Sequence, residues 1–349
     1  MKTIKVSING FGRIGRAFLK VAWERPEIEI VAVNDLSSVA NMAYLLKYDT
    51  AYGKWKHPVR VEDSNGTGDK YIVIDENKRI KVLRELDPSK LPWRELGVDV
   101  VVESTGVFVT YEKSKAHLDA GAKKVVVTAP MKDEPQAGVE GATVLMGVNE
   151  EKFDTCVITS NASCTTNAGS PLIAILDEGL EIEKALLNTA HGLTNSQPTV
   201  DSMNKHNMRE GRAGGHNIVP TSTGAAIAVT KAFPKLAGLF DGISMRVPMI
   251  TGSIVDITFI SKRNTTREEV NNILKKAASE PRWKGIFSVT EEELVSSDII
   301  GSPYGSIADL GLTRVVGGNL VKVMGWYDNE MGYTYTLVDH VIKAGESIK

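Results

Sequence analysis

The first part of the chain alternates between short apolar runs and a segment with helical spacing. Residues 2–9, KTIKVSIN, form a run rich in β-branched residues, which is typical of a strand. In residues 10–24, GFGRIGRAFLKVAWE, the apolar residues recur at the spacing of one helix face: Ile14, Phe18, Leu19 and Ala22. Residues 27–35, EIEIVAVND, again have the pattern of a strand. The order strand, glycine turn, helix and strand predicts a βαβ unit.

The pattern changes further along the chain and then returns. Residues 59–83 alternate apolar and polar positions around turn signals at 64–66 and 75–77, which predicts an antiparallel excursion from a parallel sheet. Buried strands are then predicted in 97–106, 123–130 and 156–163, with a helix in 110–121 that Gly121 ends. Residues 165–183 carry a helical apolar pattern, so a strand end and a helix start meet near residue 164.

Composition narrows the class of protein. The chain has 349 residues, 42% hydrophobic and 24% charged, which is typical of a globular protein of two domains. Its formal net charge of -2 gives no general reason to expect nucleic acid as a partner. No apolar segment approaches the length of a membrane helix, and the N-terminus does not resemble a signal peptide, so we expect a cytoplasmic protein. Cys156 and Cys164 cannot form a disulfide framework, and no zinc-type spacing is present, so no metal is expected.

The glycine turn after the first strand has the G-x-G-x-x-G pattern of dinucleotide-binding proteins. Gly10 allows a tight turn, Gly12 lets a pyrophosphate approach the backbone, and Gly15 lets helix and strand pack closely. Asp35 ends the second strand, where a carboxylate accepts hydrogen bonds from ribose hydroxyls and repels a 2′-phosphate. These features favour NAD over NADP, whereas an ordinary glycine turn is the alternative interpretation.

A second group of residues lies at the end of another predicted strand. Because open α/β sheets hold ligands at the carboxyl ends of their strands, Ser104, Thr105 and Gly106 are candidates for the cofactor site. Phe108 is a candidate for covering the nicotinamide side. An ordinary strand-to-helix turn is the alternative for all four residues.

The stretch SNASCTTN, residues 160–167, places Cys164 among small hydroxyl and amide residues at a predicted helix start. A helix N-terminus and a nearby imidazolium both lower the pKa of a thiol, so a reactive cysteine is expected, with a buried structural thiol as the alternative. Cys156 lies inside a predicted strand and favours the structural role. Of the six histidines, His191 ends a strand next to hydroxyl and amide residues, and it is the candidate base. The other five are interpreted as surface or satisfied residues.

The chain resembles phosphorylating glyceraldehyde-3-phosphate dehydrogenase over essentially its whole length. The matching stretches, in order, are INGFGRIGR, VNDL, STGVF, SNASCTTN, HGLT, PTSTGAA, RVP and WYDNEMGY. The resemblance implies an α/β fold in which a Rossmann dinucleotide-binding domain is joined to an α+β catalytic domain with a mainly antiparallel sheet. The implied bounds are 1–163 for the first domain, completed by a C-terminal helix in 329–349, and 164–328 for the second.

The resemblance also implies a reaction and the residues that carry it out. Cys164 attacks the aldehyde, His191 acts as base, a hydride passes to the nicotinamide, and inorganic phosphate cleaves the resulting thioester. The residues implied for binding the substrate phosphate are Thr194 and Arg246. Those implied for binding the attacking phosphate are Ser163, Thr165, Thr223 and Gly224. The implied contacts to NAD come from Gly10, Phe11, Gly12, Arg13, Ile14, Gly15, Asn34, Asp35, Ser104, Thr105, Gly106, Phe108, Asn329 and Tyr333.

Some positions depart from the pattern of the family. Ala168 stands where a second cysteine is usual, so an internal disulfide response to oxidation is not expected. Gly192, Leu193 and Ser196 also differ near the substrate site, and Met331 replaces the usual tryptophan near the nicotinamide. None of these changes removes a catalytic group.

The resemblance therefore implies a cytoplasmic, homotetrameric enzyme that oxidatively phosphorylates D-glyceraldehyde 3-phosphate with NAD in glycolysis or gluconeogenesis. Its expected partners are the small-molecule substrate and inorganic phosphate, with no membrane and no nucleic acid. Erythrose-4-phosphate dehydrogenase shares the cysteine and histidine, but retention of PTSTGAA argues against it. A non-catalytic NAD-binding or RNA-binding protein is the alternative from another class, and intact Cys164 and His191 argue against it.

Overall fold

A computed structural model describes residues 3–63, 68–205 and 207–348. The chain divides into two compact units: Met1–Val144, Glu150–Ala162 and Leu337–Lys349 form the first, and Leu145–Asn149 and Ser163–Thr336 form the second. The bounds expected from the sequence, 1–163, 164–328 and 329–349, stay a prediction. The predicted turn at 64–66 and the interpretation of His206 fall outside the described residues.

The first unit is built on a mixed sheet with the strand order β10-β11-β9-β8-β1-β2-β7-β6-β5. The strands are β1 (Ile4–Asn9), β2 (Ile28–Asn34), β5 (Val59–Asp63), β6 (Lys70–Ile74), β7 (Lys78–Leu83), β8 (Val100–Glu103), β9 (Lys124–Val127), β10 (Gly141–Thr143) and β11 (Ile158–Ser160). A short separate ribbon pairs β3 (Tyr48–Asp49) with β4 (Gly53–Lys54). β1 pairs in parallel with both β2 and β8 at the centre of the sheet.

The antiparallel excursion expected from the sequence is confirmed. β6 pairs antiparallel with β5 and with β7, and β7 then returns to the sheet in parallel with β2. Asp75 at the turn between β6 and β7 has a φ of 56°, in the left-handed region. One detail differs: Cys156 lies before β11 and is not part of the strand, although its side chain is buried.

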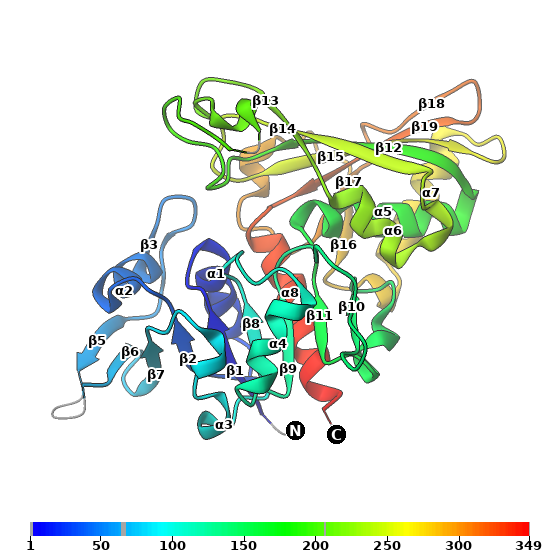
Figure 1. Ribbon diagram of the computed structural model, residues 1–349. Helices are drawn as coiled ribbons and strands as arrows, with labels where there is room; N and C mark the ends of the chain where they lie inside the picture. Colours follow the sequence, from blue (N-terminus) through cyan, green and yellow to red (C-terminus); the bar gives the residue numbers. More distant parts are fainter. Residues whose placement is uncertain (1–2, 64–67, 206, 349) are drawn as a thin grey trace. The chain divides into compact units, whose positions relative to one another are not determined.

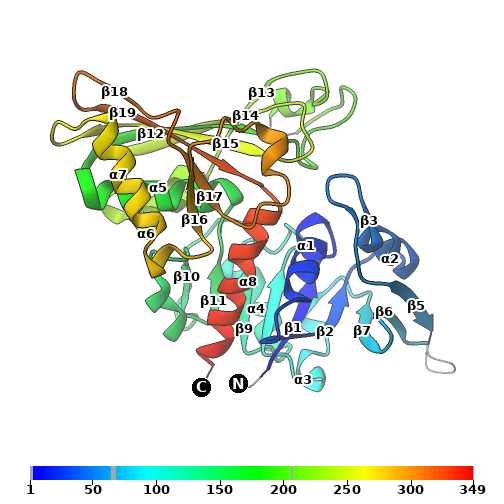
Figure 2. The same cartoon turned by 180° about the vertical axis from the view of Figure 1, so that it is seen from behind.

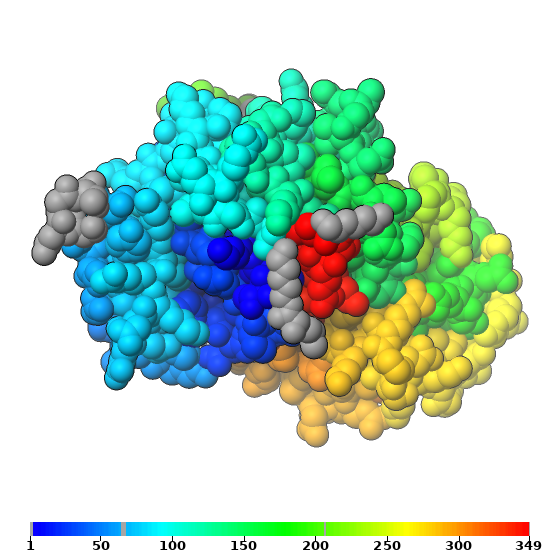
Figure 3. All heavy atoms as spheres, turned by 90° about the horizontal axis from the view of Figure 1, so that it is seen from below, coloured from blue at the N-terminus to red at the C-terminus, as the bar shows by residue number. Residues whose placement is uncertain are grey.

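Helices cover both faces of this sheet. They are α1 (Arg13–Ala22), α2 (Val39–Lys47), α3 (Trp93–Leu96), α4 (Tyr111–Asp119) and the part of α8 (Met331–Glu346) that begins at Leu337. α4 lies on one face, and α1 and α8 lie on the opposite face (Figures 1 and 2). Figure 3 shows the end of α8 in red beside the blue N-terminal strand, where a Cβ on Gly345 would meet the side chain of Ile4 at 2.5 Å. This close packing leaves no room for a larger residue at position 345.

The second unit has a sheet with the order β13-β14-β12-β15-β19-β17-β16, and β18 pairs with β19. Its strands are β12 (Ile182–His191), β13 (Val219–Ser222), β14 (Phe240–Arg246), β15 (Ser253–Ser261), β16 (Phe287–Thr290), β17 (Ser306–Asp309), β18 (Arg314–Val316) and β19 (Leu320–Tyr327). β15 is antiparallel to both β12 and β19, while β12 and β14 run in parallel. The predicted mainly antiparallel sheet is therefore confirmed, as is the parallel-stranded Rossmann architecture of the first unit.

The helices of the second unit gather on one face of its sheet. These helices are α5 (Cys164–Leu180), α6 (Ala225–Ala232) and α7 (Arg267–Ala278), and α5 packs against the other two and against four strands (Figures 1 and 2). α5 has buried side chains along nearly its whole length, which explains why its apolar pattern is not confined to one stripe. No helix within the described ranges of the chain is long and apolar enough to cross a membrane.

Candidate functional site

The glycine turn between β1 and α1 requires glycine at two positions for packing and leaves space at a third. Gly10 has a φ of +92°, and a Cβ there would lie 2.6 Å from the backbone nitrogen of Thr105. A Cβ on Gly15 would lie 2.2 Å from the carbonyl oxygen of Gly10. At Gly12, in contrast, a Cβ would meet nothing within 4 Å. Gly12 is also the N-cap of α1 and makes no side-chain cap, so backbone N–H groups remain at the helix start for an anion.

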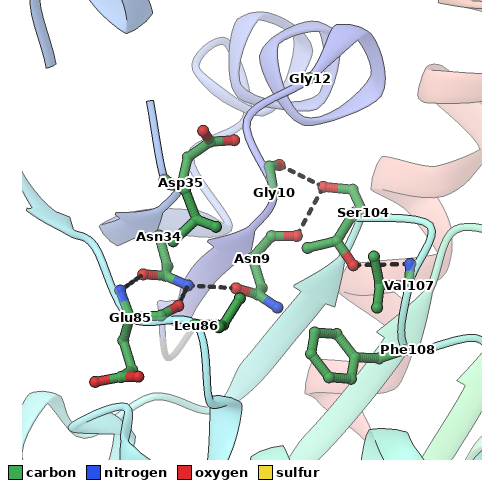
Figure 4. A pocket seen from close by; sticks show the side chains of 12 residues that line it. Asn9, Gly10, Gly12, Asn34, Asp35, Glu85, Leu86, Ser104, Val107 and Phe108 are labelled. Carbon is green, nitrogen blue, oxygen red and sulfur yellow. Dashed lines mark hydrogen bonds between the residues drawn. The ribbon is translucent and has the colours of Figure 1, made fainter. Parts of the chain in front are cut away.

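A cavity of about 300 Å³ opens at the carboxyl ends of β1, β2 and β8 (Figure 4). We call it the strand-end cavity; it is lined by Asn9, Gly10, Gly12, Asn34, Asp35, Leu36, Glu85, Leu86, Ser104, Thr105, Val107 and Phe108. Gly10, Gly12, Asn34, Asp35, Ser104, Thr105 and Phe108 were predicted from the sequence as cofactor residues. Phe11 and Gly106 lie on the adjoining turns, Arg13, Ile14 and Gly15 lie in the first turn of α1, and none of the five is part of its lining.

Asp35 is fixed at the edge of the strand-end cavity by backbone donors. Its carboxylate accepts hydrogen bonds from the N–H groups of Phe11 and Ser37, both at 2.8 Å. Burial raises the pKa of Asp35, but these bonds outweigh burial and hold the pKa below its ordinary value. The residue is therefore a carboxylate at neutral pH, and an ionised acceptor at this point suits ribose hydroxyls and disfavours a phosphate.

Arg13, on the same turn, forms an ion pair with Asp49, with Nη1 and Oδ2 3.0 Å apart. Asp49 also accepts hydrogen bonds from the backbone N–H groups of Ala51 and Tyr52. The guanidinium is thus held in place over the turn by a carboxylate, and only part of its surface is exposed.

Sequence reasoning missed part of the lining of the strand-end cavity: Asn9, Glu85, Leu86 and Val107. Asn9 directly precedes Gly10 at the end of β1, so its position at a strand end was a usable signal. Glu85 and Leu86 follow β7, whose return to the parallel sheet could be anticipated only from the pairing of β7 with β2.

In the second unit, Cys164 is the first residue of α5. Ser163 caps the helix, since its Oγ accepts a hydrogen bond from the N–H of Thr166 at 3.1 Å. Ala162, which precedes the cap, has a φ of 55°, a conformation that residues other than glycine rarely adopt. The sequence therefore folds into a sharp turn that leaves the Cys164 side chain half-buried at the helix N-terminus. The predicted strand-to-helix position of this cysteine is confirmed.

His191 is the last residue of β12, and the structure brings it to the cysteine. Its Nε2 lies 3.2 Å from the Sγ of Cys164. The parallel register of β12 and β14 places Arg246 directly opposite His191. Nη1 of Arg246 lies 2.7 Å from His191 Nδ1, and the carbonyl oxygen of Gly192 lies 2.6 Å from the same nitrogen. A thiol, an imidazole and a guanidinium thus form one contiguous group.

The charge state of this group differs from the expectation. The sequence predicted an imidazolium and a helix N-terminus that lower the pKa of the thiol. Instead, burial and then the Arg246 cation lower the pKa of His191 from 6.5 to about 3, so the imidazole is neutral. Burial raises the pKa of Cys164, and Arg246 and the Thr165 donors oppose this only in part. The resting pair is therefore thiol and imidazole, and ionisation must accompany attack on a substrate.

Tyr327 is a residue of this group that the sequence interpretation did not single out. Its hydroxyl lies 3.0 Å from Thr165 Oγ1 and 2.8 Å from Thr189 Oγ1, and its ring packs edge-on against His191 at 5.9 Å. It ends β19 just as His191 ends β12, and burial raises its pKa, so the hydroxyl stays protonated. Tyr327 ties the start of α5 to the end of β12.

The candidates for anion binding lie at the starts of helices and in or after strands of the second unit. Thr223 Oγ1 accepts a hydrogen bond from the N–H of Ala225, and Gly224 is the N-cap of α6. Thr194 Oγ1 contacts Ser196 Oγ at 2.8 Å. The Nε of Arg246 is buried and has no hydrogen-bond partner among the described residues. A guanidinium whose described polar partners are an imidazole nitrogen and a carbonyl oxygen is suited to an added anion.

Asn329 and Tyr333, which were predicted as cofactor residues, lie in the second unit and are buried. The Oδ1 of Asn329 accepts hydrogen bonds from Ser253 Oγ at 2.9 Å and from the N–H of Gly252 at 3.2 Å. These bonds orient the amide so that its NH₂ group points away from the donors. The cofactor roles of both residues stay predictions.

The positions that depart from the family pattern have clear neighbours in the second unit. A Cβ on Gly192 would lie 3.2 Å from Thr251 Cα and 3.3 Å from Asn329 Oδ1, which is tighter than usual. Leu193 packs over Gly214, where a Cβ would meet the leucine at 2.9 Å. Glycine at 192 therefore fits the close approach of these segments. The effect on kinetics stays a prediction.

Comparison with known proteins covers both units. A family model described as "Glyceraldehyde 3-phosphate dehydrogenase, NAD binding domain" matches residues 4–111, and one described as "Glyceraldehyde 3-phosphate dehydrogenase, C-terminal domain" matches residues 163–329. The chain is 47% identical to glyceraldehyde-3-phosphate dehydrogenase of Streptomyces coelicolor over 99% of this chain and 100% of that protein. The protein of the same name from Borreliella burgdorferi is 46% identical over 96% of this chain and 98% of that protein. The one from Eremothecium gossypii is 44% identical over 97% of this chain and 98% of that protein.

Proposed function

Because the chain belongs to the glyceraldehyde-3-phosphate dehydrogenase family, we propose that it converts D-glyceraldehyde 3-phosphate, NAD and inorganic phosphate to 1,3-bisphosphoglycerate and NADH. The observation that carries this proposal is the 3.2 Å approach of Cys164 Sγ to His191 Nε2 at the start of a buried helix. A nucleophile with an adjacent base is what covalent capture of an aldehyde requires.

The first steps use the neutral thiol and imidazole. As Sγ of Cys164 attacks the aldehyde carbon, His191 Nε2 accepts the thiol proton and passes it to the aldehyde oxygen, and a hemithioacetal forms. NAD, when bound, supplies the hydride acceptor. The imidazole is neutral because its pKa is low, so it carries no extra proton when the attack begins. Loss of the hydroxyl proton to His191 Nε2, and of a hydride from the hemithioacetal carbon to the bound cofactor, would leave a thioester on Cys164.

The last step is cleavage of the thioester by inorganic phosphate. A phosphate oxygen attacks the thioester carbonyl carbon, the C–S bond breaks, and Cys164 leaves with the electron pair. We assign the attacking phosphate to Ser163, Thr165, Thr223 and Gly224, whose positions at the starts of α5 and α6 are supported by cap geometry. We assign the substrate phosphate to Arg246 and Thr194, because the Arg246 guanidinium lies beside the base.

The residues of the first unit fit NAD. The open space at Gly12 and the start of α1, which has no side-chain cap, suit a pyrophosphate, and the ionised Asp35 suits the adenosine ribose. Ser104 donates to the carbonyl oxygen of Gly10 at 2.6 Å, which holds the two strand-end turns together. The residues proposed to bind NAD are thus already held in place by hydrogen bonds within the chain.

We further propose a cytoplasmic homotetramer. The face of the second sheet that the helices leave open carries exposed Leu186, Ile243 and Leu320, and this supports a subunit interface. Light scattering measures the oligomeric mass; a monomer at micromolar concentration would contradict this part of the proposal.

The test of function is a spectroscopic assay of NADH formation. It is run with glyceraldehyde 3-phosphate, with and without phosphate or arsenate, and with NAD and NADP in separate reactions. We expect phosphate-dependent reduction of NAD, and no turnover by Cys164→Ser. A clear preference for erythrose 4-phosphate, or NAD binding without turnover of either aldehyde, would overturn the proposal in favour of the two alternatives from the sequence.

A further inference from the structure

A buried group of polar side chains lies beneath the strand-end cavity, outside the catalytic group. Glu103 ends β8, and His117 lies in α4; their side chains are 1% and 0% exposed. Nε2 of His117 lies 3.0 Å from Glu103 Oε2, and Trp93 Nε1 donates to His117 Nδ1 at 3.0 Å. Because an indole N–H can only donate, Nδ1 must accept, and the proton of the neutral imidazole is on Nε2. His117 therefore donates to Glu103.

Both oxygens of Glu103 face donors. Oε1 accepts from the backbone N–H of Thr105 at 2.8 Å and from the Thr105 hydroxyl. Oε2 accepts from His117 and from Asn9 Nδ2, the latter at 2.6 Å. A carboxylate, which has acceptors only, satisfies all four donors, whereas a carboxamide of the same shape cannot.

The acceptor character of Glu103 sets the orientation of two amides in the wall of the cavity. Asn9 must present Nδ2 to Glu103, and its Oδ1 then accepts from Asn34 Nδ2 at 2.7 Å. Asn34 Nδ2 also donates to the carbonyl oxygen of Glu85 at 2.8 Å, and its Oδ1 accepts from the N–H of Glu85 at 2.8 Å. Figure 4 shows this chain of bonds from Asn9 through Asn34 to the Glu85 backbone.

We propose that Glu103 and His117 are positioning residues for the cofactor: they fix the polarity of a hydrogen-bond relay that runs through Asn9 and Asn34 and docks the Glu85–Leu86 segment against the strand-end cavity. The proposal rests on the proposed function, because it assigns NAD to this cavity. Neither Glu103 nor His117 lines the cavity, so each acts through the residues that do. The relay joins the ends of β8, β1 and β2 to the segment after β7.

The relay predicts a specific defect for Glu103→Gln. If the new NH₂ group faces Asn9, the Asn9 amide must turn over and present its own NH₂ to that of Asn34. Asn34 must then turn over as well, and its NH₂ meets the N–H of Glu85. If the NH₂ group instead faces Thr105, it meets the Thr105 N–H, so two donors meet in either orientation, and a buried unsatisfied donor is costly. The cavity wall is expected to shift, at the Glu85–Leu86 segment in the first orientation and at Thr105 in the second.

The same reasoning predicts a rescue. In Asn9→Asp alone, two carboxylates face each other across the 2.6 Å contact, so this variant is also defective. In the double variant Asn9→Asp with Glu103→Gln, the acceptor-only group has moved one position along the relay. The new carboxylate at position 9 then accepts hydrogen bonds from the new amide at position 103 and from Asn34. It also accepts from His117, because one of its oxygens takes the place of Asn9 Nδ2, which lies 3.4 Å from His117 Nε2. The contacts from position 103 through position 9 to Asn34 then again join a donor to an acceptor.

The experiment measures NAD and ADP-ribose binding by calorimetry, together with KM for NAD, kcat and thermal unfolding, for wild type, both single variants and the double variant. Glu112→Gln, an exposed change of the same kind on α4, is the matched control. We expect Glu103→Gln to raise the Kd for NAD about tenfold, because one unsatisfied buried donor has a free-energy cost of the size that a tenfold change in Kd represents. At saturating NAD, kcat should stay within about twofold of wild type. The double variant should return to within about threefold of wild type, a non-additivity that simple loss of packing does not produce.

Each outcome decides the proposal. The relay is overturned if Glu103→Gln has the Kd for NAD of wild type. It is also overturned if the losses of binding free energy in the two single variants simply add in the double variant. If Glu103→Gln does not fold, a double variant that folds and binds supports the relay, and one that also fails to fold overturns it. Failure of the proposed function looks different, because wild type would then bind NAD without oxidising glyceraldehyde 3-phosphate, or would not bind NAD.

Discussion

Replacing Arg246 by methionine should make His191 more basic. Arg246→Met removes a cation whose Nη1 lies 2.7 Å from His191 Nδ1 while keeping a side chain of similar length. The groups that face the imidazole are the Cys164 thiol, the Arg246 guanidinium, the ring of Tyr327 and the carbonyl oxygen of Gly192. Since the guanidinium is the cation among them, its loss favours the protonated imidazole.

The size of this effect is bounded by the structure. The pKa of His191 falls from 6.5 to about 3, which is about 3.5 pH units, and burial is the larger cause. Two unit charges about 4 Å apart at an effective dielectric constant of about 20 interact by about 4 kcal/mol, or about three pH units, which is an upper limit. As Arg246 is the second cause, we expect the pKa of His191 to rise by about one to two units in the variant.

The assay is an NMR titration of the histidine rings in the apo protein, with His191→Gln to assign the signal. His340 is an internal control, because burial also lowers its pKa to about 3 and its cationic neighbour is Lys124, not Arg246. Arg246→Lys keeps the charge and should leave His191 untitrated over the same range. The reasoning is refuted if His191 in Arg246→Met shows no more protonation at about pH 4.5 than wild type.

Three further predictions separate the roles assigned to individual residues. Cys164 should react with iodoacetamide faster than Cys156, which is only 4% exposed, and peptide mass mapping of both sites over time checks this; equal rates would contradict a reactive Cys164. Gly12→Ala should keep the melting temperature but weaken NAD binding. Gly10→Ala should lower the melting temperature, because its Cβ would lie 2.6 Å from backbone atoms. Calorimetry that finds the same loss of melting temperature in both variants would refute this distinction. Ser163→Ala should cost about 1 kcal/mol of stability through loss of the α5 cap, with Ser163→Thr as control, and chemical denaturation measures it.

The sequence predicted those parts of the site that local signals determine. The glycine turn, the strand that ends directly before Asp35 and the helix start at Cys164 each follow from residues within a few positions, and the structure has them within one residue of the expected place. His191 at the end of β12 was predicted on the same grounds. The site roles of these residues stay predictions, but their placement follows from turn and periodicity rules.

The rest of the site depends on strand register and on burial, which cannot be predicted from a local sequence pattern. Arg246 lies beside His191 although 55 residues separate them, because β12 and β14 pair in parallel. The neutral state of His191 and the raised pKa of Cys164 come from surroundings contributed by several remote strands and helices. The buried pair of Glu103 and His117 was equally hidden, since a histidine in a polar helix gives no sign that its ring is enclosed.

The direct pairing of His191 with Arg246 also limits how this protein can change through evolution. From Ala185↔Phe240 onward the two strands advance in step to His191↔Arg246. Inserting or deleting one residue in either strand would slide the base past the guanidinium and turn alternate side chains to the opposite surface. Length variation among descendants of this chain should therefore accumulate in connecting segments, while the spans 185–191 and 240–246 keep their residue count even where their identities drift.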